Sequence, residues 1–175
     1  DELRGAPPLV LSELNATIEN AHGAHALGLS ARIPPELGSS IEVRARVQGE
    51  LEPGAVSGRV FVELGYTDLA AWRPWIDYPL NLRAGQGALR VWATLERGAL
   101  KEATADIALA DVTASLADEL SPLELVSVRG RVFGRSLPDG AETPGRGLSL
   151  VAAGGPQIPQ TDFQIVWRPQ AGGVL

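Results

Sequence analysis

The stretch "SSIEVRARVQGELE", residues 39–52, decides the fold because it alternates strictly between apolar and polar residues. Its apolar positions are Ile41, Val43, Ala45 and Val47. The positions between them carry glutamate, two arginines and glutamine. A period of two over this length is typical of a half-buried antiparallel strand that is wet on one face.

The same period recurs along the chain in "GRVFVEL" (58–64), "GALRVWATLERG" (87–98) and "LVSVRGRVFGRSL" (125–137). Short stretches that contain Gly, Pro or Asp separate these runs, as in meandering sheets. We expect nine strands, at about 9–19, 25–33, 40–51, 57–65, 81–96, 100–116, 125–137, 146–153 and 161–168. The predicted fold is mainly β: one segment spanning residues 1–175, a long and strongly curved antiparallel meander that forms an open groove or partial barrel.

The predicted strand at 100–116 changes phase along its length. Ala103, Ala105 and Ile107 share one parity, whereas Val112 and Ala114 follow the other. A slip of one residue is what a β-bulge produces. The alternative is a strand that ends near residue 110. The glycine pair in "RAGQGALR", residues 83–90, similarly predicts a bend or bulge.

A single helix is predicted, at about 67–73 within "TDLAAWRPWIDYPL" (67–80). Thr67 is suited to cap its N-terminus, and Asp68 suits the positive end of the helix dipole. Pro74 would remove a backbone hydrogen bond and clash with the preceding turn, so the helix should end or kink there.

Composition excludes several classes of function. The formal net charge is −6, and the 15 basic residues are scattered, so no nucleic-acid partner is expected. Without cysteine the chain has no disulfide or thiolate zinc site. It has no run of 18 apolar residues and no visible signal peptide. Because methionine is absent even at position 1, we expect a processed protein or an excised fragment, with residues 169–175 frayed.

Candidate chemistry is sparse. His22 and His25 are the only histidines, and without a third ligand they are better interpreted as solvated turn residues than as a metal site. No nucleophile motif or phosphate loop is visible. We therefore expect no enzyme activity, no metal and no cofactor.

Aromatic residues are concentrated in one region, since five of the nine lie between Tyr66 and Trp92. Trp72, Trp75 and Tyr78 could stack on a sugar or pack in the core, and packing is favoured because aromatics dominate cores. A curved sheet must also hide its apolar face, and one short helix is too little to cover it.

The order of these elements resembles the YhdP family of bacterial envelope proteins, within the AsmA-like superfamily that includes TamB. The resemblance spans about residues 10–168. It comprises a helix of the type D-L-x-x-W before a proline, a strand of the type G-x-G-x-L-x-x-W, and a strand with spaced glycines. Matching positions are Asp68, Leu69, Trp72, Gly85, Gly87, Trp92, Leu125, Val128, Gly130 and Gly134.

The resemblance implies a large protein anchored in the inner membrane, with a periplasmic portion built from repeated β-groove units. It also implies the transport of phospholipids between the inner and outer membranes and a role in the outer-membrane permeability barrier. The expected partners are phospholipid acyl chains and neighbouring groove units of the same full-length chain, with membrane contact only through other regions. The helix at 67–73 would mark a boundary between units.

The apolar strand positions are the candidate groove lining: Val43, Ala45, Val47, Val60, Val62, Leu64, Leu89, Val91, Ala93, Ala105, Ile107, Val126 and Val128. Phe61 and Trp92 lie on the other parity, so the residues alone leave open which face is inner. Two other hypotheses are a carbohydrate- or protein-binding β-module that uses Trp72, Trp75 and Tyr78, and a structural scaffold.

Overall fold

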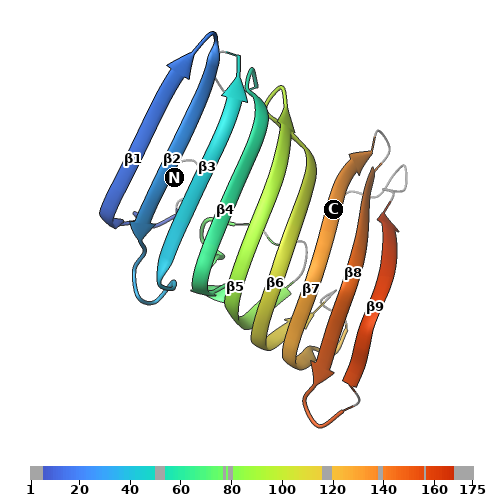
Figure 1. Cartoon of the computed structure of the whole chain (residues 1–175). Coiled ribbons are helices and arrows are strands. Elements are labelled where there is room, and N and C mark those ends of the chain that lie inside the picture. Colours follow the sequence, from blue (N-terminus) through green and yellow to red (C-terminus); the bar gives the residue numbers. More distant parts are fainter. Residues whose placement is uncertain are drawn as a thin grey trace.

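The described part of the chain forms a nine-stranded antiparallel sheet whose strands lie side by side in sequence order (Figure 1). The structure is a computed structural model that describes residues 6–49, 54–76, 78, 81–115, 120–137, 140–155 and 157–167. The strands are β1 (Ser12–Ala21), β2 (Ala24–Arg32), β3 (Ser40–Gln48), β4 (Ser57–Asp68), β5 (Asn81–Glu96), β6 (Ala99–Ser115), β7 (Leu123–Leu137), β8 (Gly140–Ala152) and β9 (Gln157–Trp167).

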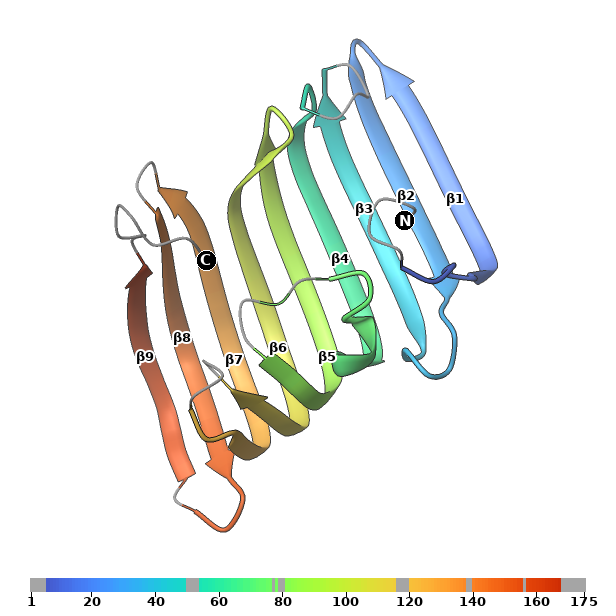
Figure 2. The ribbon, with the colours of Figure 1, turned by 180° about the vertical axis from the view of Figure 1, so that it is seen from behind.

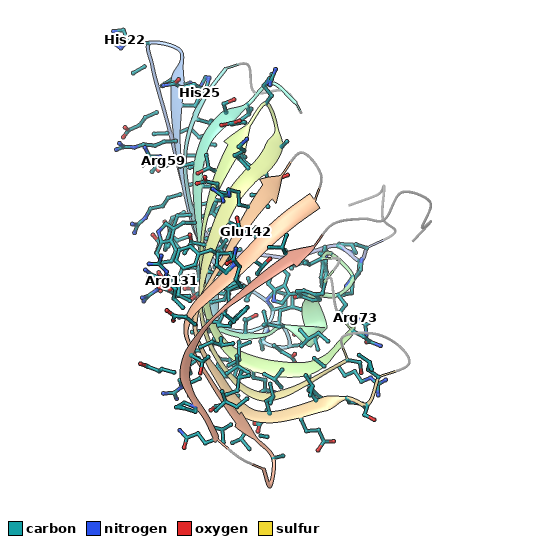
Figure 3. All side chains as sticks on the ribbon, turned by 90° about the vertical axis from the view of Figure 1, so that its right-hand side faces the viewer. His22, His25, Arg59, Arg73, Arg131 and Glu142 are labelled. Atoms are coloured by element: carbon teal, nitrogen blue, oxygen red, sulfur yellow. The ribbon has the colours of Figure 1, made fainter. Side chains whose placement is uncertain are left out.

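The predicted fold class is confirmed, because the structure is mainly β and its antiparallel sheet is not closed. Viewed along its edge, the sheet curls strongly toward one side (Figure 3). The largest error in strand bounds is at β8, which begins at Gly140 rather than near residue 146. Pro144 and its glycine neighbours suggested a loop, but pairing with β7 and β9 overrides that local preference. The predicted frayed residues 169–175 lie outside the described part of the chain.

Tight turns join the strands at the end where β1 meets β2, here called the upper end. His22 and Gly23 have φ angles of 53° and 75°, and Arg97 and Gly98 have φ angles of 49° and 73°. Positive φ at both central residues characterises the two-residue hairpin turn whose twist matches that of the strands. The strands therefore reverse over two residues at both positions.

The predicted bulges are confirmed. Between β5 and β6, the pairing shifts from Gln86–Ala110 to Ala84–Thr113, which inserts one extra residue into β6. Asp111 lies in this interval with a φ of 51°. After the bulge Val112 faces the same side as the apolar residues before it, and it is buried there. A bulge keeps the strand continuous while re-aiming its side chains.

Strand register collects the apolar residues on one face, here called the apolar face. Directly opposite residues in an antiparallel pair point to the same side. One such row runs Leu29, Val43, Val62, Val91, Ala105 and Val132 from β2 to β7. The other face, called the polar face, carries the intervening charged residues.

The predicted helix is shorter than expected and begins later. It is one 3₁₀ turn, η1 (Ala70–Trp72), whereas residues 67 and 68 belong to β4. The Asp68 N–H donates to the Leu37 carbonyl at 2.9 Å, and the Leu69 N–H donates to the Gly85 carbonyl at 2.9 Å. These bonds to neighbouring segments hold the backbone extended up to Leu69. The Asp68 carboxylate, rather than Thr67, accepts from the Ala70 and Ala71 N–H groups.

The connection from β4 to β5 folds back over the sheet. Its described residues, 69–76 and 78, are called the covering segment. They lie over the lower ends of the strands, on the side facing the reader in Figure 2, with the N-terminal stretch before β1 beside them. Two buried clusters form beneath, one around Leu82 and Val112 and the other around Leu64 and Trp72. β4 and β5 remain paired with each other, so the sheet continues past this segment.

Candidate functional site

The apolar face is the candidate site, and most of the predicted lining residues lie on it side by side. Register pairs Val43 with Val62 and Val62 with Val91, and the next row pairs Ala45 with Val60 and Val60 with Ala93. Nine of the predicted residues on this face are half-buried: Val43, Ala45, Val60, Val62, Leu89, Val91, Ala93, Ala105 and Ile107. They form an apolar surface that the described residues cover only in part.

Four predicted lining residues behave differently. Val47, Leu64 and Val128 are on the same face but buried rather than half-buried. Val126 does not join the row, because 49% of it is exposed and the adjacent Leu125 packs against the buried cluster instead. The pairing of β7 with β8 shifts between Leu125 and Ser127, so the alternation changes phase there.

The lower end of the apolar face is closed by a hydrogen-bonded core. The Trp72 indole N–H donates to the Thr67 hydroxyl at 2.7 Å, and that hydroxyl donates to the Leu37 carbonyl at 2.7 Å. Thr67 is completely buried, and Trp72 is 6% exposed. The chain of bonds satisfies every polar group it buries, which stabilises the covering segment in one position.

Trp75 and Tyr78 complete this closure. The ring centroids of Trp72 and Trp75 lie 5.8 Å apart in an edge-on arrangement, and the Trp75 indole N–H donates to the Pro7 carbonyl at 3.1 Å. The Tyr78 hydroxyl donates to the Leu69 carbonyl at 2.8 Å. Burial, and secondarily the charge of Asp68, raises the pKa of Tyr78 above its ordinary value. The three aromatics therefore pack against protein.

Trp92 is separate from these three aromatics, on the polar face. It packs against Phe61 with ring centroids 5.3 Å apart, and the Arg131 guanidinium lies 5.8 Å from its ring centroid. The predicted aromatic cluster is thus divided between the two faces. Figure 3 shows Arg59 and Arg131 on the side opposite Arg73, which follows η1.

Ion pairs cross the strands of the polar face. Arg90 pairs with Glu63 at 2.9 Å, and Arg131 donates to Asp106 at 2.7 Å through a guanidinium NH₂ group. Hydrogen bonding by Arg131 holds the pKa of the Asp106 carboxyl below its ordinary value. Such exposed pairs add little stability but keep the face charged and hydrated.

A sequence model of the YhdP protein family matches residues 6–175. The chain belongs to the YhdP family. No curated protein and no solved structure gives a significant match. Membership in the YhdP family indicates a cell-envelope protein of the lipid-transport type.

This YhdP-family chain offers few candidate residues for a metal site. His22 lies in a turn, and His25 hydrogen-bonds the Asn20 side chain at 2.7 Å. Within the described ranges, no three His, Asp or Glu side chains are placed to share a metal ion. Among the described residues, no helix has the length and apolar character needed to cross a membrane.

Several residues that shape the site were not singled out by sequence reasoning. Ile33 and Leu37 are buried against Trp72. Ile33 was expected only as the last residue of the strand at 25–33, and Leu37 lies in "PPELGSS", which indicated only a turn. Leu82, which the sequence did not single out, forms the second cluster with Leu69 and Val112. Leu37, the apolar residue between the prolines and the glycine, was the available indication, since a solvated turn does not need it.

Proposed function

We propose that this chain is a segment of a periplasmic protein that carries phospholipids between the inner and outer membranes, with acyl chains lying on the apolar face. The observation that carries the proposal is the set of half-buried aliphatic rows that cross the sheet in register. Exposed apolar surface of this extent is unfavourable in water and marks an interaction site.

The chemistry of the rows suits acyl chains. From β3 to β7 the residues aligned on this face between the two ends are aliphatic or glycine, as in the row Ile41, Leu64, Leu89, Ile107 and Gly130. A charged head group would find no partner among them. The head group therefore extends toward solvent while the acyl chains lie against the sheet.

The same register supports a path for the acyl chains that crosses the strands. Each row runs perpendicular to the strands, so an acyl chain moving along a row passes from strand to strand over similar side chains. The covering segment closes the lower end and forms a floor beside this path. Neighbouring units of the full-length chain would extend the path at the outer strands.

The proposal includes no chemical step. Catalysis needs a base or nucleophile that is oriented by further groups, and the aliphatic rows contain neither. The alternative sugar platform of Trp72, Trp75 and Tyr78 is not favoured, because Trp72 is buried and its indole N–H is already bonded to Thr67.

Binding of a fluorescent phospholipid to the purified chain tests the proposal, together with native mass spectrometry for lipid that co-purifies. Val62→Asp and Val91→Asp place a carboxylate in the central row and should reduce lipid binding about 10-fold or more, because burying an unpaired charge is costly. In the full-length protein the same changes should block transport.

The matched control is Arg44→Glu, which introduces a carboxylate on the polar face of the neighbouring strand β3. Binding and transport should tolerate it. Equal sensitivity at Val62 and Arg44 would contradict the assignment of the apolar face, and a chain without any lipid affinity would contradict the proposed function.

A further inference from the structure

The polar face carries a depression whose polar and aromatic residues have no assigned role. It spans β1 to β6 near the upper end and has a volume of about 1110 Å³. The side chains around it include Arg44, Arg46, Arg59, Phe61 and Trp92. Register places these residues on the face opposite to the aliphatic rows.

Arg46 and Arg59 are directly opposite each other on β3 and β4. Like charges in that position destabilise a sheet. Across the part of the chain that the structure describes, neither arginine forms an ion pair, although other arginines of this face do. Two adjacent guanidinium groups that no described carboxylate binds present up to ten N–H donors, in a geometry that suits oxyanions.

A second arginine pair shows what neutralisation looks like. Arg131 and Arg146 are also opposite each other, on β7 and β8. There Asp106 accepts two hydrogen bonds from Arg131, and the Arg146 guanidinium lies 5.6 Å from the Phe133 ring centroid. The Arg46–Arg59 pair forms no such bond among the described residues. It lines the depression together with Glu19 and Glu102, which lie in the same row, each two strands away from the nearer arginine.

The surroundings of the pair indicate the kind of anion. Trp92 is 40% exposed and lies beside Phe61 in the next row. Hydroxyl groups of Ser57, Thr94 and Thr104 line the same depression. Aromatic rings with exposed faces contact the C–H faces of sugar rings, and hydroxyls exchange hydrogen bonds with sugar hydroxyls. A hollowed surface also fits a chain of sugars better than a flat bilayer.

We propose that this depression binds an acidic saccharide, with Arg46 and Arg59 holding its carboxylate or phosphate and Trp92 contacting an adjacent sugar ring. The site is independent of the proposed lipid path, because it lies on the other face of the sheet. It would let the protein hold an anionic envelope glycan without obstructing the aliphatic rows.

Isothermal titration calorimetry of the whole chain with a tetramer of galacturonic acid tests the site, and Trp fluorescence gives a second readout. The double variant Arg46→Gln/Arg59→Gln should weaken binding at least ~10-fold, the loss expected for one charge-assisted hydrogen bond. Its melting temperature should be equal to or above that of the wild type, because the substitution removes a like-charge contact. If circular dichroism shows that the double variant keeps its secondary structure, the loss of binding is assigned to the site and not to unfolding.

The charge-matched control is Arg129→Gln/Arg146→Gln, which removes two exposed arginines of the same face outside the depression. It should bind the tetramer like the wild type. Neutral maltotetraose should bind at least ~10-fold more weakly than the acidic tetramer.

Three results would overturn the proposal. One is an equal loss in the two double variants, which would indicate a general charge effect. Another is equal binding of maltotetraose. The third is binding only to vesicles that contain phosphatidylglycerol, which would make the surface a membrane contact. Lipid binding by the Val62→Asp variant is measured separately, so failure here leaves the proposed function intact.

Discussion

The two ends of the apolar face have the same alternation of residues but differ in what covers them. At the lower end, Leu64 is 6% exposed beneath Trp72. Two residues earlier on the same strand and face, Val62 is only half-buried. The comparison teaches that the period of two decides which side chains share a face, whereas a separate segment decides which part of that face becomes a core.

Removal of Trp72 should cause the largest loss of stability, because this side chain covers the lower end of the apolar face. Trp72→Ala leaves a cavity beneath the covering segment and frees the Thr67 hydroxyl, and should lower the free energy of unfolding by about 3–5 kcal/mol. Urea denaturation followed by circular dichroism measures this loss. Trp92→Ala is the control on the polar face and should cost only about 1 kcal/mol. Equal costs would contradict the covered core.

The pair Leu64→Ala and Val62→Ala compares the two parts directly. Leu64→Ala should cost about 2–5 kcal/mol because it empties a buried site. Val62→Ala should cost about 1 kcal/mol, since part of the removed surface was already exposed to water. The same denaturation experiment measures both. If Val62→Ala were the more damaging, the central row would be a packed core and not an open surface.

Thr67→Val tests the polar link that holds the cover. The substitution preserves the shape of the side chain but leaves the Trp72 N–H and the Leu37 carbonyl without their partner. We expect a loss of about 1–3 kcal/mol. Hydrogen exchange should show faster exchange at the Trp72 indole, whereas Thr94→Val on the polar face should leave that rate unchanged. An unchanged indole rate in Thr67→Val would argue against the bond.

The smallest effect is expected on the polar face. The pKa of Asp106 is lowered in the folded state by its hydrogen bond from Arg131, so its ionised form stabilises the fold above its unfolded pKa. That contribution is lost as the pH falls through the lower, folded pKa. NMR titration should locate the depressed pKa and show it returning toward its ordinary value in Arg131→Gln. An Asp106 that titrates normally in the wild type would contradict the pair.

Local patterns predicted the strands, their order and the bulge near Asp111, because alternation and phase are properties of neighbouring residues. They did not predict the cover. The burial of Trp72 depends on Ile33 and Leu37, which lie more than 30 residues away in the sequence and meet it only through the register of the sheet. The length of β8 was missed for a similar reason, since its partners on both sides outweigh its one proline and its glycines.

The arginine depression also depends on register. Arg46 and Arg59 are unremarkable in sequence, where 13 positions separate them, and become neighbours only when β3 and β4 pair. Sequence alternation places both arginines on the polar face but does not predict that they lie directly opposite each other on paired strands.

The sequential order of the strands has a consequence for how such a protein changes length. Each strand hydrogen-bonds only to the strands before and after it in the chain. Contacts of this kind resemble those of repeat proteins, in which stability is shared between nearest neighbours and no distant closure must be satisfied. Adding or deleting one hairpin therefore preserves both the pairing and the sidedness of every remaining strand, so evolution can adjust the span of the molecule in steps of two strands.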